Sequence, residues 1–271
     1  MLHTEILLLW AAIFAYVAAF FIHILGFIAC KAAGARYAVF TLWISLGLHT
    51  ATVIVRWIAG GHPPVTDTYE LNLTGTWITV LVFLIFERLR KADRAIALLV
   101  TPAAFLVLGY GLMSRVEAVP MGPAYRSPWL AVHVIFAWLA FGCYIISTGA
   151  AMLLLLRARL TAARPALKIP GSETLDIASY RFIVLGFVNH AVMLVSGAVW
   201  AKNLWGHYWS WDPLETWSLI AFLFYAFYLH SRAFLGWRLR PAAYLALVGL
   251  ILLAISFWGV GWFAPSVHPG P

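Results

Sequence analysis

Eight apolar segments divide this chain, and each is long enough, or nearly so, to cross a lipid bilayer. A spanning helix needs about 20 mostly apolar residues. Lipid offers the backbone no hydrogen-bond partner, so helices and closed barrels are the structures that span it. We therefore predict an all-α polytopic membrane protein in which residues 1–271 form one integral membrane domain, with spanning helices at 6–29, 37–58, 73–88, 95–113, 129–156, 179–200, 217–235 and 242–262.

Composition excludes several other classes of protein. The chain is 63% hydrophobic and 10% charged, whereas about a quarter of the residues of a soluble domain are charged. Its net charge of +8 comes from basic residues scattered between apolar blocks, a pattern that does not indicate nucleic-acid binding. Cys30 and Cys143 form no CxxC motif, so we expect neither a disulfide framework nor a zinc site. The first apolar segment is expected to be a retained helix, because no basic residue precedes it.

The positions of the basic residues predict how the helices are oriented. Cytoplasmic connections carry an excess of Lys and Arg. Fourteen of the 18 basic residues lie in or beside the odd-numbered connections: Lys31, Arg36, Arg88, Arg90, Lys91, Arg94, Arg157, Arg159, Arg164, Lys168, Arg181, Arg232, Arg238 and Arg240. These connections are therefore predicted to be cytoplasmic. Both termini and the tryptophan-rich connection at 201–216 are then expected on the outer, periplasmic side.

Histidines gather toward the predicted outer surface. His62, His207 and His268 lie in the outer connections. His133 follows about one turn inside the fifth predicted helix, within roughly 10 Å of its outer end. A histidine inside lipid is costly unless it has a partner, and it is a candidate functional residue for that reason. A hydrogen bond to a neighbouring helix is the alternative role for the four that lie deeper in the predicted helices: His23, His49, His190 and His230.

The segment WAKNLWGHYWSWDPLETW, residues 200–217, holds five of the 14 tryptophans. Its second part is typical of a helix start, with Asp212 as N-cap, Pro213 as first helical residue and Glu215 as capping-box partner. Its first part places three indoles between Trp205 and Trp211. A tryptophan at a membrane interface usually stands singly at a helix end. We therefore predict that these rings form a platform for a flat ligand.

Histidines beside an aromatic platform favour iron porphyrin as that ligand. Porphyrin has a broad apolar face, its iron takes imidazole as an axial ligand, and its two propionates need cations or backbone donors. A quinone also fits aromatic walls, but it needs fewer histidines. An isolated metal ion would require closely spaced ligands, which the sequence does not contain.

The stretch WGHYWSWDPLETW resembles the WWD signature of the haem-handling membrane proteins of cytochrome c maturation. Further stretches are similar, in the same order, to the CcsA (ResC) subunit family of the system II cytochrome c synthase. They are RWIAGGHPPVTDTYE, SPWLAVHVIFAWLAFG, GAVWA and FYAFYLHSR, followed by a histidine in the tail. The resemblance covers most of the chain from about residue 45 onward and implies eight spanning helices.

The resemblance implies roles for individual residues. His133 and His268 match the two outer histidines that are axial ligands of haem in this family. His230 matches an intramembrane histidine that receives haem on its way across, and it lies roughly 20 Å below Trp217 by helical rise. The tail around His268, FAPSVHPGP, departs from the glycine-leucine-histidine-serine-tyrosine pattern usual in the family. The predicted platform consists of Trp205, Gly206, Trp209, Trp211 and Asp212, with Arg56, Arg126 or Lys202 beside the propionates.

The function implied is cytochrome c biogenesis in the bacterial cytoplasmic membrane. The chain is expected to move haem b across the membrane as a transported substrate and to present it for thioether attachment to the CxxCH motif of an apocytochrome c. Expected partners are a CcsB (ResB) membrane subunit, the apocytochrome, a thiol-reducing protein and membrane lipid, and no nucleic acid. The chain would form part of a holocytochrome c synthase, and no catalytic residue is predicted, because binding and orientation are the protein's part. The alternatives are a CcmC-type haem exporter without ligase activity and a cytochrome b electron-transfer subunit.

Overall fold

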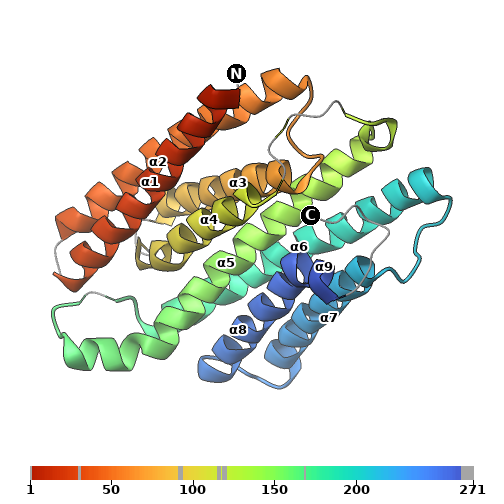
Figure 1. The fold of residues 1–271 in the computed structure, drawn as a ribbon. Helices are drawn as coiled ribbons and strands as arrows, with labels where there is room; N and C mark the ends of the chain where they lie inside the picture. The colour runs from red at the N-terminus through yellow and green to blue at the C-terminus, as the bar shows by residue number, and fades with distance from the viewer. Residues whose placement is uncertain are drawn as a thin grey trace. The chain divides into compact units, whose positions relative to one another are not determined.

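The computed structural model describes residues 2–29, 32–90, 94–114, 117, 121–167 and 169–263, and within them the chain is helical (Figure 1). The long helices are α1 (Leu2–Ile28), α2 (Ala32–Gly60), α3 (Thr68–Arg90), α4 (Ala97–Leu112), α5 (Pro128–Ala163), α6 (Ser172–Trp205), α7 (Pro213–Phe234) and α8 (Arg240–Ala254). The short elements are η1 (Arg94–Ile96), η2 (Pro123–Tyr125), a π-helical turn η3 (Ile255–Gly259) and α9 (Val260–Phe263). The prediction of an all-α membrane protein is confirmed.

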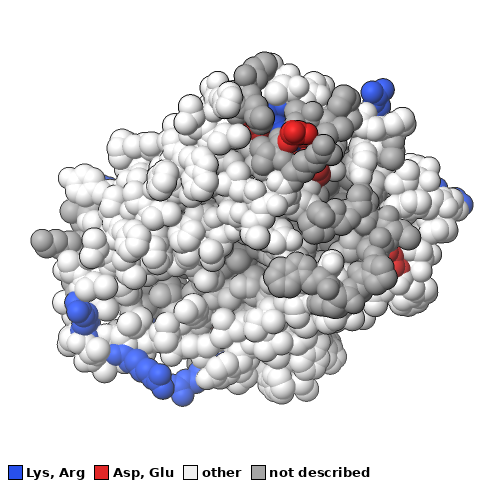
Figure 2. Space-filling model, viewed as in Figure 1, with Lys and Arg blue, Asp and Glu red and all other residues white. Residues whose placement is uncertain are grey.

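Seven of these helices are long and apolar enough to cross a membrane, with η1 extending α4 and η3 extending α8. The eighth long helix, α7, spans 22 residues and is not one of these seven; it carries Glu215, His230 and Arg232. Much of the molecular face shown in Figure 2 bears no charge, as expected for surface that contacts lipid chains. The side of the membrane on which each connection lies stays a prediction.

Two helices extend well beyond their predicted ends. The fifth and sixth were predicted at 129–156 and 179–200, whereas α5 has 36 residues and α6 has 34. The added turns are polar, so a search for apolar runs does not find them, yet nothing in those turns breaks a helix. The helix α6 stops only at Gly206, whose φ of 84° is the left-handed conformation that glycine adopts readily at a helix end.

The chain folds as two compact units. The first contains residues 1–123 and 156–170, and the second contains 124–155 and 171–271. In the first unit α1 and α2 lie side by side along their length, with α3 and α4 forming a second pair (Figure 1). That the whole chain acts as one integral membrane domain stays a prediction.

The core of the second unit is built on two tyrosines. The rings of Tyr144 in α5 and Tyr225 in α7 stack at 3.6 Å between centroids, with 4° between their planes. Gly186 of α6 and Gly249 of α8 flank this pair, and a Cβ at either position would come within 2.8 Å of a tyrosine ring. The two glycines therefore let α6 and α8 pack directly against aromatic faces. This close packing holds four helices around one aromatic pair.

Candidate functional site

The start of α7 has the geometry predicted from WDPLET. Asp212 is the N-cap, and its Oδ1 accepts a hydrogen bond from the Leu214 N–H at 2.9 Å. Glu215 completes the capping box, with its Oε2 3.3 Å from the backbone nitrogen of Asp212. Pro213 occupies the first turn, where its missing N–H costs nothing. The prediction that this part of the tryptophan segment starts a helix is confirmed.

The end of α6 bounds the tryptophan segment on its other side. The N–H of Gly206 donates to the carbonyl of Lys202 at 3.1 Å, and the Lys202 ammonium donates back to the Gly206 carbonyl at 2.6 Å. Trp205 is the last helical residue. The predicted connection 201–216 thus contains two helix ends, and its non-helical part is short, because it runs only from Gly206 to Asp212.

Four of the five indoles of the segment form two pairs. Trp200 and Trp205, both on α6, have ring centroids 5.7 Å apart. Trp209 and Trp211, both in the connection, meet edge to face at 5.8 Å. The Trp211 side chain is 70% exposed. The Trp209 indole N–H is buried and has no hydrogen-bond partner among the described residues, so it remains a donor for an acceptor such as a carboxylate oxygen.

His133 lies beside the first of these pairs. Its ring centroid is 6.4 Å from that of Trp200, and Tyr125 lies at the same distance on the same indole. The Nδ1 of His133 is 2.9 Å from the carbonyl oxygen of Met193. A carbonyl can only accept, so Nδ1 carries the proton and the lone pair of the neutral ring is on Nε2. His133 is therefore held as the tautomer whose Nε2 can coordinate iron.

Gly197 sets how closely α6 approaches the His133 ring. A Cβ at this position would lie 2.6 Å from His133 Nδ1 and 2.9 Å from its Cε1. Real Cβ atoms essentially never approach so closely, so any other residue would push the imidazole away. Neither Gly197 nor the Met193 carbonyl was predicted as part of the site. The small residues of GAVWA, one turn before Trp200, are the signal in the sequence that indicates such a close approach.

The other predicted residues lie apart from this cluster. His230 is on α7, exposed, and stacked on Phe234 with ring centroids 4.7 Å apart. Arg126 is exposed in the short stretch between η2 and α5. His268 lies outside the described residues. His190 is buried, with its ring nitrogens 3.5 Å from the Tyr144 hydroxyl and 3.3 Å from Ser218 Oγ, as in a core histidine that hydrogen-bonds neighbouring helices.

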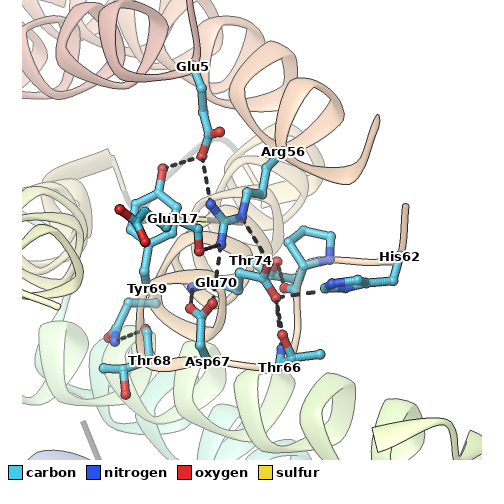
Figure 3. A network of polar contacts seen from close by, with 12 residues as sticks. Glu5, Arg56, His62, Thr66, Asp67, Thr68, Tyr69, Glu70, Thr74 and Glu117 are labelled. Carbon is cyan, nitrogen blue, oxygen red and sulfur yellow. Dashed lines mark hydrogen bonds and ion pairs between the residues drawn. The ribbon is translucent and has the colours of Figure 1, made fainter. Parts of the chain in front are cut away.

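Arg56 lies in the first unit, in a buried ionic cluster (Figure 3). Its guanidinium is fully buried and pairs with Glu70 at 2.8 Å, Asp67 at 3.2 Å and Glu5 at 3.7 Å. The Tyr69 ring covers it at 5.0 Å, and the Tyr69 hydroxyl donates to Glu5. Burial raises the pKa of the Asp67 carboxyl above its ordinary value. The predicted contact of Arg56 with a propionate stays untested, and its partners among the described residues include three carboxylates of its own chain and the Glu117 carbonyl at 3.4 Å.

His62 and His49 also have structural partners in the first unit. The ring Nδ1 of His62 is 2.9 Å from the carbonyl oxygen of Pro63, and it lies 4.0 Å from Glu70 at the edge of the same cluster (Figure 3). The ring Nδ1 of His49 is 3.2 Å from the hydroxyl of Tyr16. Both histidines are buried. His49 thus joins α2 to α1, whereas His62 lies in the connection after α2, beside the first turn of α3.

Known proteins that are similar to this chain in sequence belong to one family. The family model for cytochrome C assembly protein matches residues 65–268. The cytochrome c biogenesis protein CcsA of Synechococcus sp. (strain CC9902) is 33% identical over 250 residues, which cover 82% of each chain. CcsA of Prochlorococcus marinus (strain AS9601) is 32% identical over 271 residues, covering 90% of this chain and 87% of the relative.

A solved structure is also similar in fold. The cytochrome c haem lyase CcmF superposes with a TM-score of 0.67 over 95% of this chain, at 18% sequence identity. This chain spans about half of that protein, since the match covers 49% of it. At this identity the likeness concerns the helical fold alone.

Proposed function

The chain belongs to the cytochrome c assembly protein family, and we propose that it carries haem b to an outer site and presents it for covalent attachment to apocytochrome c. Its place in cytochrome c biogenesis and in a membrane follows from the family and from the helices. We further propose the route that haem takes, the partner proteins and the residues that bind it. The membrane is proposed to be the bacterial cytoplasmic membrane, with residues 206–212 on its periplasmic side.

The observation that carries the proposal is the setting of His133. Its ring is fixed by the Met193 carbonyl, fits against Gly197 and adjoins the Trp200 indole. A ligating histidine usually donates its other ring N–H to a carbonyl or carboxylate, which orients the ring and makes the coordinating nitrogen more basic. A histidine that only packs a core needs no such cradle beside an aromatic group. We assign His133 as an axial ligand of haem iron, with His268 as the second.

The exposed part of the platform supports the same substrate. Trp209 and Trp211 offer apolar indole faces in a position that water and a ligand can reach, since Trp211 is 70% exposed. Iron porphyrin has a matching apolar face and two carboxylates. Arg126 is exposed in the same unit and is the proposed partner of a propionate. Trp205, Gly206 and Asp212 shape the platform by ending α6 and starting α7.

His230 is proposed to receive haem before it reaches the platform. It lies 17 positions after Pro213 on one continuous helix, which is roughly 25 Å by helical rise. Its exposed ring lies at the surface of the described chain, where it could share haem iron with a ligand from a CcsB-type membrane subunit. Haem entering near His230 would then cross most of the membrane thickness to reach His133.

The attachment chemistry needs orientation more than it needs a catalytic group. Each apocytochrome thiol adds across a haem vinyl group: the sulfur bonds to one vinyl carbon and the hydrogen goes to the other. The addition has no net oxidation or reduction. The protein holds the reactants close together and in register, and that alone can remove a large part of the barrier. The cysteines must arrive reduced, so a thiol-reducing protein is the proposed upstream partner.

Coexpression tests this proposal. Cells that produce the chain, a CcsB-type subunit and an apocytochrome with CxxCH should make covalently haem-bearing cytochrome c. His133→Ala should abolish that product, while His3→Ala, which alters an exposed histidine at the start of α1, should leave it unchanged. Normal yield from the His133→Ala variant would refute the assigned role. Export of haem without covalent product in the complete system would instead indicate a haem exporter.

A further inference from the structure

Trp211 has a backbone conformation that tryptophan rarely adopts. Its φ is +60°, and among the described residues only Leu239 shares a positive φ without being glycine. A bulky side chain in this region is strained, because its Cβ crowds the backbone. Such residues persist only where surrounding contacts hold them, and they concentrate at functional sites. The contacts that hold Trp211 therefore bear on how the platform is built.

Three of those contacts come from one carboxylate. Oε2 of Glu215 accepts from the backbone N–H of Ser210 at 2.8 Å, from the Ser210 hydroxyl at 3.1 Å and from the backbone N–H of Asp212 at 3.3 Å. The two N–H groups flank Trp211 and converge on one oxygen. Backbone N–H groups that converge in this way, in a stretch that combines right-handed and left-handed residues, form a concave anion-binding nest. The positive φ of Trp211 is the conformation that forms this nest.

The capping box explains only part of this arrangement. Helix capping requires the contact from Glu215 to the N-cap nitrogen of Asp212. It requires neither of the two bonds to Ser210, nor a strained residue between them. The Thr216 hydroxyl adds a further contact, donating to the Trp211 carbonyl at 3.3 Å. Glu215 thus ties the first turn of α7 to the backbone that projects the exposed Trp211 ring.

We propose that Glu215 is a positioning residue for the haem platform: its carboxylate fills the backbone nest at residues 210–212 and so holds Trp211 in the left-handed conformation that projects its indole. This inference rests on the proposed function, because it takes haem to be what the indole contacts. It assigns Glu215 no contact with haem. The residue acts through Trp211, and the strain of that residue is the cost of presenting the ring before the ligand arrives.

Hydrogen exchange tests the contact without haem. In the full chain purified with its membrane partner, the amides of Ser210 and Asp212 should be protected. Glu215→Ala should raise their exchange by roughly fivefold or more, the loss expected for removed hydrogen bonds. Glu215→Gln, which keeps an acceptor oxygen, should raise it less. Glu173→Ala removes an exposed acid from the first turn of α6 and is the matched control, with no effect on these amides. Unchanged exchange in Glu215→Ala would overturn the proposal.

A double-mutant cycle tests the consequence for haem. Glu215→Ala should weaken haem binding by about fivefold to tenfold in the presence of Trp211. In a Trp211→Gly background, where the residue is unstrained and the indole is gone, the same change should alter haem affinity by less than about twofold. Trp211→Gly alone should weaken haem binding and raise the thermal unfolding midpoint, because it removes the strain.

The results of these two experiments distinguish a failure of the positioning role of Glu215 from a failure of the proposed haem site. An equal loss of haem affinity from Glu215→Ala in both backgrounds would overturn the positioning role, because the residue would then act through the helix alone. Faster exchange in Glu215→Ala together with unchanged haem binding in Trp211→Gly would have a different meaning. It would support the role of Glu215 in holding the backbone and overturn the assignment of the indole to haem.

Discussion

A single glycine sets the distance between α6 and the imidazole of His133. With a hydrogen in place of a Cβ, Gly197 lets the ring lie against the helix while its Nδ1 reaches the Met193 carbonyl. The orientation of the imidazole, and with it the direction of the Nε2 lone pair, follows from these two backbone features. The proposed ligand and its cradle thus come from different helices, α5 and α6.

Gly197→Ala should displace the His133 ring and weaken haem ligation. The added methyl group would overlap the imidazole, and overpacking of this kind costs about 1–3 kcal/mol. We expect haem affinity to fall by roughly tenfold and the low-spin haem spectrum to weaken, with partial recovery on addition of free imidazole. Gly47→Ala is the control, because a Cβ at Gly47 meets nothing within 4 Å. Equal haem affinity in the two variants would show that Gly197 does not position the ring.

His133 and Arg56 were both predicted to bind the ligand. They differ in how much of their surroundings could be predicted from the sequence. The position of His133 about one turn inside the start of the fifth helix was readable from the sequence. The partners of Arg56 were not, because Glu5 lies 51 positions before it along the chain and meets it only in the folded protein. A contact between Arg56 and a propionate was predicted because Arg56 lies in a predicted outer connection. The sequence does not show which residue pairs with such an arginine. Three carboxylates around one guanidinium are a product of tertiary packing.

For the helices, the sequence predicted correctly those features that depend on residues close together in the chain. The capping box of α7 was readable because Asp212, Pro213 and Glu215 act within one turn. The ends of α5 and α6 were not, because their polar last turns continue the helix without any apolar signal. The strain at Trp211 was also invisible, since no residue preference predicts a tryptophan at positive φ. That conformation depends on Glu215 and appears only in three dimensions.

One ion pair ties the start of α6 to the end of α7. Arg232 donates to both oxygens of Asp176, at 2.9 and 2.6 Å, and the side chains are 10% and 7% exposed. The N–H of Leu239, in the connection to α8, donates to the same carboxylate at 2.9 Å. One aspartate therefore joins two helices and the connection to a third.

Asp176→Asn should destabilise the second unit strongly. Removing one partner of a buried ion pair leaves the other charge uncompensated, at a cost of about 3–5 kcal/mol. The thermal unfolding midpoint of the full chain in detergent should fall by several degrees, roughly as expected from that cost. Glu173→Gln alters an exposed acid one turn away and should leave the midpoint unchanged. A midpoint in Asp176→Asn equal to that of the control would contradict the role given to this pair.

At the scale of the whole molecule, the sequence was most informative about class. Long apolar segments predicted an all-α membrane protein, and the WWD segment predicted its family, because both signals are written in residue types. The division into two compact units was not foreseen, since it follows from which helices pack together. Sidedness was predicted from the distribution of Lys and Arg, and it calls for a direct test.

Labelling with a membrane-impermeant maleimide tests the sidedness. His207→Cys and Ala162→Cys both place a thiol at an exposed position, in the connection before α7 and at the end of α5. In a background where Cys30 and Cys143 are serine, the positive-inside rule predicts labelling of His207→Cys in intact cells. Ala162→Cys should react only after the membrane is permeabilised. The reverse pattern would place the tryptophan connection in the cytoplasm and end the proposal of an outer haem site.

We propose that His133 ligates haem at the tryptophan platform. The optical spectrum of the full chain, purified with its membrane partner and then reduced, tests this ligation. Two imidazoles on iron give a low-spin spectrum, which we predict for the unaltered protein and for His3→Ala. In His133→Ala the low-spin signal should lose the part that comes from haem bound at the outer site. That part should return when free imidazole is added. A low-spin spectrum of undiminished intensity in His133→Ala, without imidazole, would show that His133 does not ligate haem.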